Sequence, residues 1–275
     1  DVCALFALYQ GDLSDLDRLS RELEEIARTA TDPECIADAL TYPAAWHVLS
    51  GRRDQAVDML AKGLAIATKT SNQRLIANLQ NQLGILLLDQ GEPDAARRYL
   101  VECVASLRAI GDAWFLSQFL DTLAATELAC GDHASADRTW KEGVELSAQL
   151  GDFTNAIACL AGLACTASAT GDHARAVRLA SSHRKLVAQW SGVPLPCVSK
   201  ELSLSETRSK QALGARRAEL ARRDGMQMSL EHALVYAAEP NAPSASEPGL
   251  LSRREEDVAV RVAMGMTNRQ IAEET

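Results

Sequence analysis

The spacing of apolar and polar positions predicts helices along most of the chain. Between residues 73 and 90, apolar side chains recur every three or four positions, as an amphipathic helix requires. They are Leu75, Ile76, Leu79, Leu83, Leu86 and Leu87. The next stretch opens at Pro93, a residue well suited to a first helical turn, and continues with Ala96, Leu100, Val104 and Leu107. No segment shows the alternation of apolar and polar residues that a strand would have. We therefore predict an all-α fold.

Turn residues recur at a fixed period. Glycines stand 40 residues apart, at Gly11, Gly51, Gly91, Gly131 and Gly171. A second series lies midway, at Ser71-Asn72, Gly111-Asp112 and Gly151-Asp152. Each interval fits one helix of roughly 16–18 residues, about 25 Å long. Alanines keep the same phase and mark close helix contacts; they are Ala56, Ala96, Ala136 and Ala176. Helix pairs at such a period predict an α-solenoid.

The repeat resembles a known helical motif. Leu83-Gly84 followed by Ala96 and Leu100 occupies positions like the Leu-Gly, alanine and aromatic sites of a tetratricopeptide repeat. Leu123-Ala124, Ala136 and Trp140 repeat the arrangement. The resemblance covers residues 31–190, with the usual 34-residue repeat stretched to 40. The predicted fold class is an all-α, tetratricopeptide-like α-solenoid of about 40-residue helix-pair repeats.

Composition divides the chain into four predicted segments. Residues 1–191 form the repeat domain, and residues 192–239 leave the period and are interpreted as a helical capping segment. Residues 240–249 contain three prolines and no apolar side chain larger than alanine before the final glycine, which predicts a tether. Residues 250–275 are the last segment, a truncated helix-turn-helix.

Two successive helix starts support that last prediction. Ser252 and Glu255 have capping-box spacing, and Gly265 ends the helix that they begin. Thr267 and Gln270 then form a second capping box. Two helices joined by so short a turn must cross steeply, which indicates the front half of a helix-turn-helix.

The same stretch resembles the opening of a LuxR-type DNA-binding domain. The agreeing positions are Leu251, Ser252, Arg254, Glu255, Val258, Ala263, Gly265, Thr267, Asn268, Ile271 and Ala272. Arg253 replaces the usual proline, Ala259 replaces a larger apolar residue, and Val260-Arg261 reverses the expected order. The resemblance assigns Thr267, Asn268 and Arg269 to DNA contact. The base-reading helix of such a domain is not among these residues, so we expect this chain alone to bind DNA poorly.

Charge and cysteine content limit the partners and the compartment. The net charge is −9, divided as −8 over residues 1–191 and −1 over residues 192–275. Such a body cannot hold phosphates by counterion release, so DNA contact must come from a complete C-terminal domain. No apolar run is long enough to cross a membrane. Seven cysteines without a C-x-x-C motif are interpreted as reduced core residues in a cytoplasm. The start at Asp1 suggests a fragment.

Candidate chemistry favours binding over catalysis. The five histidines lack H-x-x-x-H and H-E-x-x-H spacing, and no phosphate-binding loop or nucleophile motif is found, so we predict no enzyme, metal or cofactor. A solenoid offers a concave face, on which the repeat phase places Asn78, Asn81, Gln118 and Asp121 beside Ile85 and Leu128. This polar groove could hydrogen-bond a ligand or an extended peptide, or be merely solvated. The tryptophans are interpreted as packing residues.

Three functions remain open. The resemblance implies a fragment of a large LuxR-family transcriptional regulator, whose solenoid senses a small-molecule or protein effector and controls promoter binding. Such a solenoid could also form a homo-oligomer. The alternative is a tetratricopeptide-like protein-interaction scaffold without DNA binding. A regulatory subunit of a nucleotide hydrolase is the third hypothesis.

Overall fold

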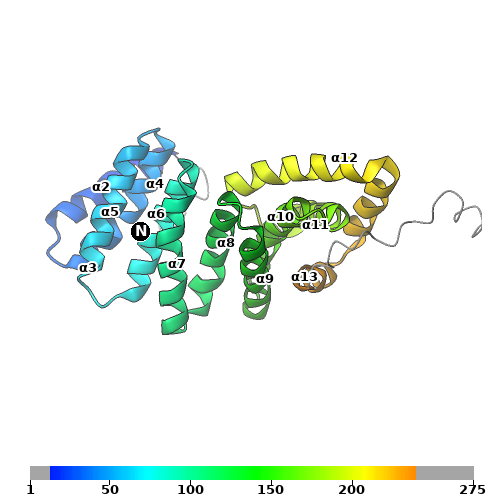
Figure 1. The fold of residues 1–275 in the computed structure, drawn as a ribbon. Coiled ribbons are helices and arrows are strands. Elements are labelled where there is room, and N and C mark those ends of the chain that lie inside the picture. The colour runs from blue at the N-terminus through cyan, green and yellow to red at the C-terminus, as the bar shows by residue number, and fades with distance from the viewer. Residues whose placement is uncertain (1–12, 240–275) are drawn as a thin grey trace, which may run out of the picture. The chain divides into compact units, whose positions relative to one another are not determined.

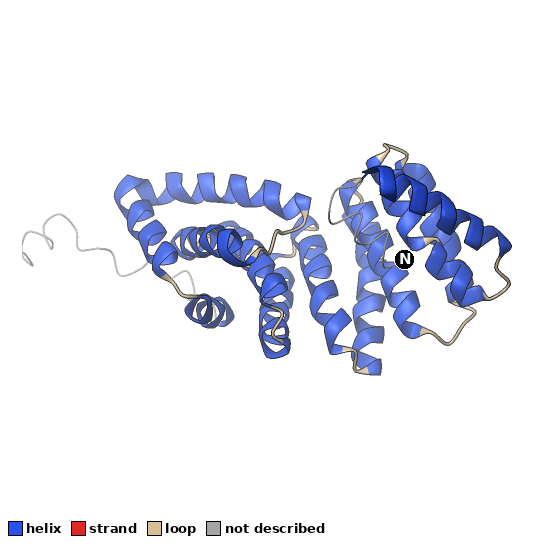
Figure 2. Cartoon of the chain, turned by 180° about the vertical axis from the view of Figure 1, so that it is seen from behind, coloured by secondary structure: helices blue, strands red, loops and turns tan. Residues whose placement is uncertain are grey.

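The computed structural model describes residues 13–239, and every regular element in that range is an α-helix (Figures 1 and 2). The chain divides into two compact units, Asp1–Glu239 and Pro240–Thr275, and the described residues belong to the first. The helices are α2 (Leu13–Thr29), α3 (Pro33–Ala39), α4 (Thr41–Leu49), α5 (Arg53–Ala67), α6 (Gln73–Asp89), α7 (Pro93–Ile110), α8 (Ala113–Ala129), α9 (His133–Leu150), α10 (Phe153–Ala169), α11 (His173–Trp190), α12 (Pro196–Gln227) and α13 (Leu230–Ala238). The predicted linker and helix-turn-helix lie outside the described residues.

A repeated turn sets the helix boundaries. Gly111, Gly131, Gly151 and Gly171 all have φ between +72° and +88°, a conformation that only glycine adopts without strain. The aspartate after each glycine caps the next helix, as where Asp132 accepts from the Ser135 amide at 3.1 Å. A glycine that ends one helix and an aspartate that begins the next recur every 20 residues here, so that a pair of helices spans the 40-residue period. From α6 to α11 the helices alternate between 17 and 18 residues, as the sequence predicts.

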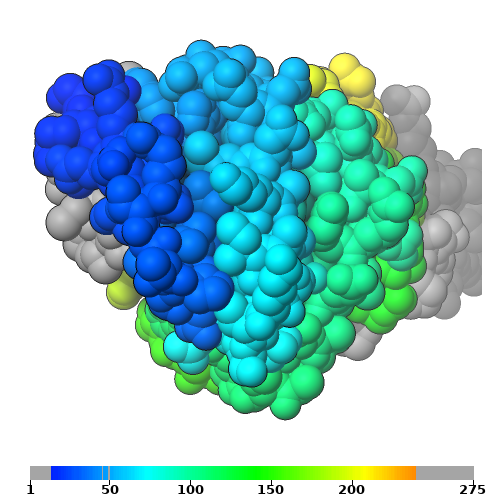
Figure 3. Space-filling view, turned by 90° about the vertical axis from the view of Figure 1, so that its left-hand side faces the viewer, coloured from blue at the N-terminus to red at the C-terminus, as the bar shows by residue number. Residues whose placement is uncertain are grey.

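Consecutive helices pack as pairs, and the pairs stack in chain order. Each helix from α5 to α11 contacts the next, and α6 contacts α8 as α8 contacts α10. Viewed from its N-terminal end, the unit shows the colours running in order across its surface (Figure 3). The phased alanines are buried, with Ala56, Ala96 and Ala136 at 0% exposure. The predicted α-solenoid of helix pairs is confirmed.

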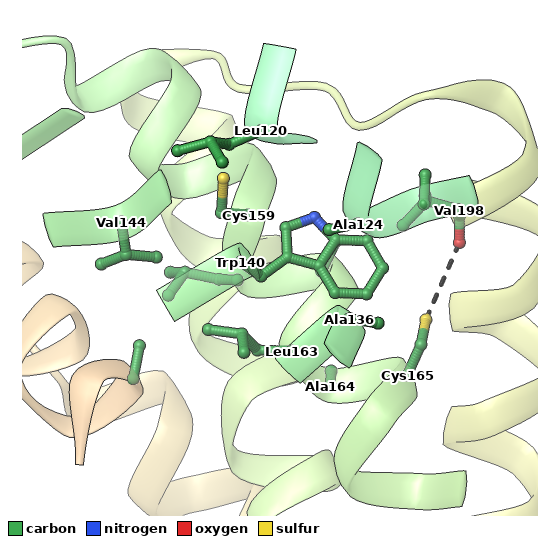
Figure 4. Packing of buried hydrophobic residues seen from close by; sticks show 14 of the residues in the cluster. Leu120, Ala124, Ala136, Trp140, Val144, Cys159, Leu163, Ala164, Cys165 and Val198 are labelled. Carbon is green, nitrogen blue, oxygen red and sulfur yellow. Dashed lines mark hydrogen bonds between the residues drawn. The ribbon is translucent and has the colours of Figure 1, made fainter. Parts of the chain in front are cut away.

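The largest core cluster centres on Trp140 of α9, which is 0% exposed. Leu120, Val144 and Leu163, from three helices, belong to the same cluster and are drawn with the indole in Figure 4. A Cβ added at Gly162 of α10 would lie 2.0 Å from the Trp140 ring, so α10 approaches the indole where it carries no side chain. Trp140 therefore holds α8, α9 and α10 in register.

The first repeat departs from the period. The interval that should hold one helix contains two, because α3 ends at Ala39 and α4 begins at Thr41. Pro43 has no amide hydrogen to donate to the Ala39 carbonyl, and its ring would collide with that carbonyl in a continuous helix. The expected single helix is thus interrupted near Leu40.

The C-terminal helices fold back over the last pair. α12 contacts α10 and α11, and α13 contacts α9, α10 and α11. Gly214, with φ +73° and ψ 163°, kinks α12. The buried Arg175 guanidinium donates to the carbonyls of Ala237 at 2.8 Å and Glu239 at 3.2 Å, and so fastens the end of α13. The interpretation of residues 192–239 as a separate capping segment stays a prediction.

Two groups of residues differ from expectation. Trp114 and Trp190 are 53% and 52% exposed, whereas Trp140 alone is fully buried as expected of a packing residue. Both exposed indoles lie at helix ends, and the Trp190 ring lies edge-on to Phe153 of α10 with 6.0 Å between the ring centres. Among the cysteines of the described range, Cys35 and Cys197 are exposed and are not core residues. Each lies in the first turns of its helix.

Candidate functional site

The first helices of the N-terminal pairs border a hollow of about 440 Å³. α3 contacts α6, and α6 contacts α8, so residues far apart in the sequence meet there. The lining consists of Glu34, Cys35 and Asp38 of α3, Tyr42 of α4, Asn72, Arg74, Leu75 and Asn78 of α6 and its cap, and Phe115 of α8. We call it the α3/α6/α8 hollow. It brings together carboxylate, guanidinium, amide and aromatic groups.

A second hollow of about 590 Å³ adjoins the first. The two share Asn72 and Arg74, and the second continues along the turns at Ser71–Gln73 and Ile110–Ala113. The half-exposed Ile110 lies on its wall. Together the two hollows form a trough across consecutive repeats rather than one enclosed cavity.

The guanidinium of Arg74 is held by its neighbours. Its Nε donates to Asp112 Oδ2 at 2.6 Å, and its Cζ lies 5.6 Å from the centre of the Phe115 ring. Asp112 is 7% exposed in its side chain and also caps α8 by accepting from the Phe115 amide. Because Arg74 is 64% exposed, the pair contributes little to stability. It does fix where the positive charge lies.

The two α3 carboxylates that line the hollow, Glu34 and Asp38, have weaker interactions than Arg74 has. Glu34 Oε2 accepts from Asn72 Nδ2 at 2.9 Å, which ties α3 to the cap of α6. Asp38 is half-buried, and burial raises its pKa above the ordinary value. Within residues 13–239, neither carboxylate forms an ion pair with a basic side chain. The hollow therefore has an acidic side at α3.

The four residues predicted to line a groove lie in different surroundings. Asn78 lines the α3/α6/α8 hollow. Asn81 is only 4% exposed. Gln118 is half-buried and donates to Asp152 of the next repeat. The sequence places all four on one face, but the structure brings Asn78 alone to the hollow.

Asp121 is an interior residue, because its carboxylate accepts from Trp140 Nε1 at 2.7 Å and is 8% exposed. Burial raises the pKa of this carboxyl to about 6, although the hydrogen bond from Trp140 lowers it. Its function in the fold is to orient the central indole. It is not placed to contact a ligand in the groove.

A further hollow of about 500 Å³ lies where α12 covers the ends of α8 and α10. Ala125, Leu128 and Ala169 supply apolar lining, and Leu128 is one of the predicted groove residues. Glu201 and Arg208 lie in the same lining and pair at 3.5 Å, so their charges offset one another. The described residues bring together no group of His, Cys, Asp or Glu side chains suited to a metal ion.

Sequence reasoning missed Glu34, Asp38, Arg74 and Phe115. A signal for the first two existed, since Asp38 precedes Asn78 by 40 residues and Glu34 precedes Arg74 by the same interval. Extending the period one repeat toward the N-terminus would have placed both on the groove face. The interruption at Pro43 follows both positions and leaves their phase intact.

The predicted DNA-contact residues Thr267, Asn268 and Arg269 lie outside the described residues. No helix of the described range is both long and apolar enough to span a membrane. The family match reported below ends at residue 109, so it does not test the C-terminal residues. These DNA contacts stay predictions.

Comparisons with known proteins agree with the architecture. Residues 7–109 match the family model described as tetratricopeptide repeat. A search of curated protein sequences finds no match. The Rap protein complexed with Competence and Sporulation Factor is similar in fold, with 15% identity and a TM-score of 0.60 over 85% of this chain and 74% of that one.

Two further structures show the same likeness. BtubC (BKLC) from P. vanneervenii has 17% identity and a TM-score of 0.58, over 69% of this chain and 78% of its own. The Podosopora anserina protein with nearly identical TPR-like repeats has 19% identity and a TM-score of 0.54, over 76% of this chain and 97% of its own. Identities this low concern the fold alone. With the repeat match and the helix-pair architecture, they show that the described part of the chain is a tetratricopeptide-like helical repeat domain.

Proposed function

We propose that this repeat domain is a protein-interaction scaffold that holds a segment of a partner protein in the α3/α6/α8 hollow. The observation that carries the proposal is the convergence of Glu34, Asp38, Arg74 and Asn78 on one open hollow between stacked repeats. Charged and amide side chains at such a place can pair with polar groups of a bound chain, while Phe115 offers apolar contact.

The form of the site favours a segment of chain over a compact small molecule. The hollow and its neighbour share Asn72 and Arg74, so an occupant can extend from one into the other. An extended segment presents side chains at regular intervals and uses such a trough along its length. The solved Rap protein, which shares this fold, is in complex with Competence and Sporulation Factor, so a fold of this kind can hold a bound factor.

The test is selection of 12-residue random peptides on the immobilised chain. Asn78→Trp fills the hollow, and Lys62→Trp on the exposed face of α5 is the matched control. We expect peptides of micromolar affinity whose Kd rises at least about tenfold with Asn78→Trp and stays unchanged with Lys62→Trp. Circular dichroism checks that both variants remain helical. Absence of enriched peptides, or equal affinity for both variants, refutes the proposal.

A second and finer function is favoured by the sequence of residues 251–275. We propose that in a longer protein the repeat domain governs a LuxR-type DNA-binding domain, in which Thr267, Asn268 and Arg269 contact DNA. Partner binding in the trough would alter solenoid curvature or self-association and so change how paired DNA modules meet their half-sites. The six cysteines of the described range are unpaired, which fits the cytoplasmic setting of such a regulator.

The test is fluorescence anisotropy with random-sequence duplex DNA at low salt. This chain is compared with a version that runs about 40 residues past Thr275, enough for a recognition helix. Binding by the longer version alone, with steep salt dependence, supports the regulator. Binding by neither version leaves the scaffold without a DNA-directed function.

A further inference from the structure

The charges of the α3/α6/α8 hollow do not balance. Arg74 is paired with Asp112 at 2.6 Å and is held over the Phe115 ring, so its charge is already offset. Glu34 receives one amide hydrogen bond, from Asn72. Asp38 has no basic partner within the described range. The two α3 carboxylates of the hollow are thus not neutralised by a basic side chain of the described residues.

The two carboxylates lie on one side of α3. Glu34 and Asp38 are four residues apart, so their side chains share a helix face, where like charges repel. Both are half-buried, which limits the water that can screen them. Burial also raises the pKa of Asp38, because desolvation disfavours the charged form of the carboxyl group. A cation placed between them would relieve the repulsion.

The aromatic lining suits the same occupant. Tyr42 comes from the helix that follows α3, whereas the Phe115 ring of α8 already lies against the Arg74 guanidinium. Aromatic faces attract ammonium and guanidinium groups and also pack against their aliphatic stems. The amide of Asn78, in the same lining, can accept a hydrogen bond from a cationic head group.

Resting on the proposed function, we infer that the partner segment bound in the α3/α6/α8 hollow carries a lysine or arginine side chain, which enters between Glu34 and Asp38. A segment with an acidic side chain or a free carboxylate at this place would meet two like charges, and Arg74 is engaged by Asp112. The site therefore selects for positive charge rather than merely tolerating it.

The test starts from peptides recovered by the selection on the wild-type chain. The double variant Glu34→Gln/Asp38→Asn removes both charges, and the new amide side chain at position 34 keeps an oxygen that can accept from Asn72. Asp54→Asn/Asp58→Asn is the matched control, because these exposed aspartates of α5 have the same four-residue spacing outside the hollow. Each peptide is measured alongside a version with its Lys or Arg replaced by Gln.

We expect recovered peptides to share a basic residue whose replacement by Gln weakens binding to the wild type about tenfold. The preference for the basic peptide over its Gln version should disappear in Glu34→Gln/Asp38→Asn and persist in the α5 control. If peptides depend on the hollow, as judged by Asn78→Trp, but have no basic residue or keep their preference in the double variant, the inference is overturned and the scaffold stands. If no peptide depends on the hollow, both fall.

Discussion

Asp121 provides a direct test of how the core is assembled. Its carboxylate is buried between α8 and α9 and accepts from Trp140 Nε1 at 2.7 Å. Burial raises the pKa of this group from 3.8 to about 6. Asp121→Asn removes the charge, while the amide oxygen can still accept from the indole. The perturbation therefore separates the cost of a buried charge from the value of the hydrogen bond.

The magnitude follows from the pKa difference. A change of about 2 units corresponds to about 3 kcal/mol of free energy of unfolding. Because the folded pKa is raised, the folded state holds the proton more tightly than the unfolded state. The group's contribution is most favourable below about pH 4, declines as pH rises toward about 6, and levels off above that.

The assay is urea unfolding followed by circular dichroism and tryptophan fluorescence between about pH 4 and pH 8, the window set by the two pKa values. From about pH 4 to about pH 8, the free energy of unfolding of Asp121→Asn should rise by about 3 kcal/mol relative to that of the wild type. A constant cost of the new amide group cancels in that difference. The exposed Asp58→Asn is the control. A stability difference that is the same at both ends refutes the reasoning.

Three other substitutions test separate parts of the fold. Gly162→Ala should lower the free energy of unfolding by about 1–3 kcal/mol, because the new Cβ would lie 2.0 Å from the Trp140 ring; an unchanged Tm contradicts this packing. Asp172→Ala removes the α11 cap, which accepts from the Arg175 amide at 3.0 Å, and should cost about 1 kcal/mol in urea unfolding; an equal midpoint and slope argue against the cap. Arg175→Leu leaves the Ala237 and Glu239 carbonyls without their donor, so hydrogen exchange should accelerate in α13 but not in α6; unchanged α13 protection refutes the fastening.

The repeat architecture could be predicted because its boundary signals are local. A glycine with positive φ and an aspartate that caps the next helix act within a few residues, so their period is visible in the sequence. Gly111-Asp112 and Gly151-Asp152 mark two such turns, and helices end and begin there. The helix-pair fold follows because amphipathic helices of equal length must bury their apolar faces against one another.

The site was less predictable, because exposure depends on neighbours that a helical period does not reveal. The period assigned Asn78 and Asp121 to one face, yet Asn78 lines a hollow and Asp121 bonds the indole of Trp140. Asn81, at the same repeat position as Asp121, is also only 4% exposed, so the two positions differ in burial in both repeats. Trp114 was expected to pack but is half-exposed, since residue type alone does not tell whether another element covers a helix end.

The repeat nevertheless shows why the proposed binding surface lies in the N-terminal repeats. Gln118 and Ala158 stand one and two 40-residue periods after Asn78. The side chain of Ala158 is only 6% exposed. At the position of Ile85, they carry Ala125 and Cys165, at 2% and 1% exposure. α12 lies over α10, with the Cys165 thiol 4.0 Å from the Val198 carbonyl. Helix α12 thus occupies the face of α10 that corresponds to the open face of α6. The lining of the α3/α6/α8 hollow includes no residue of α12, so the proposed partner segment could reach the open face of α6 there.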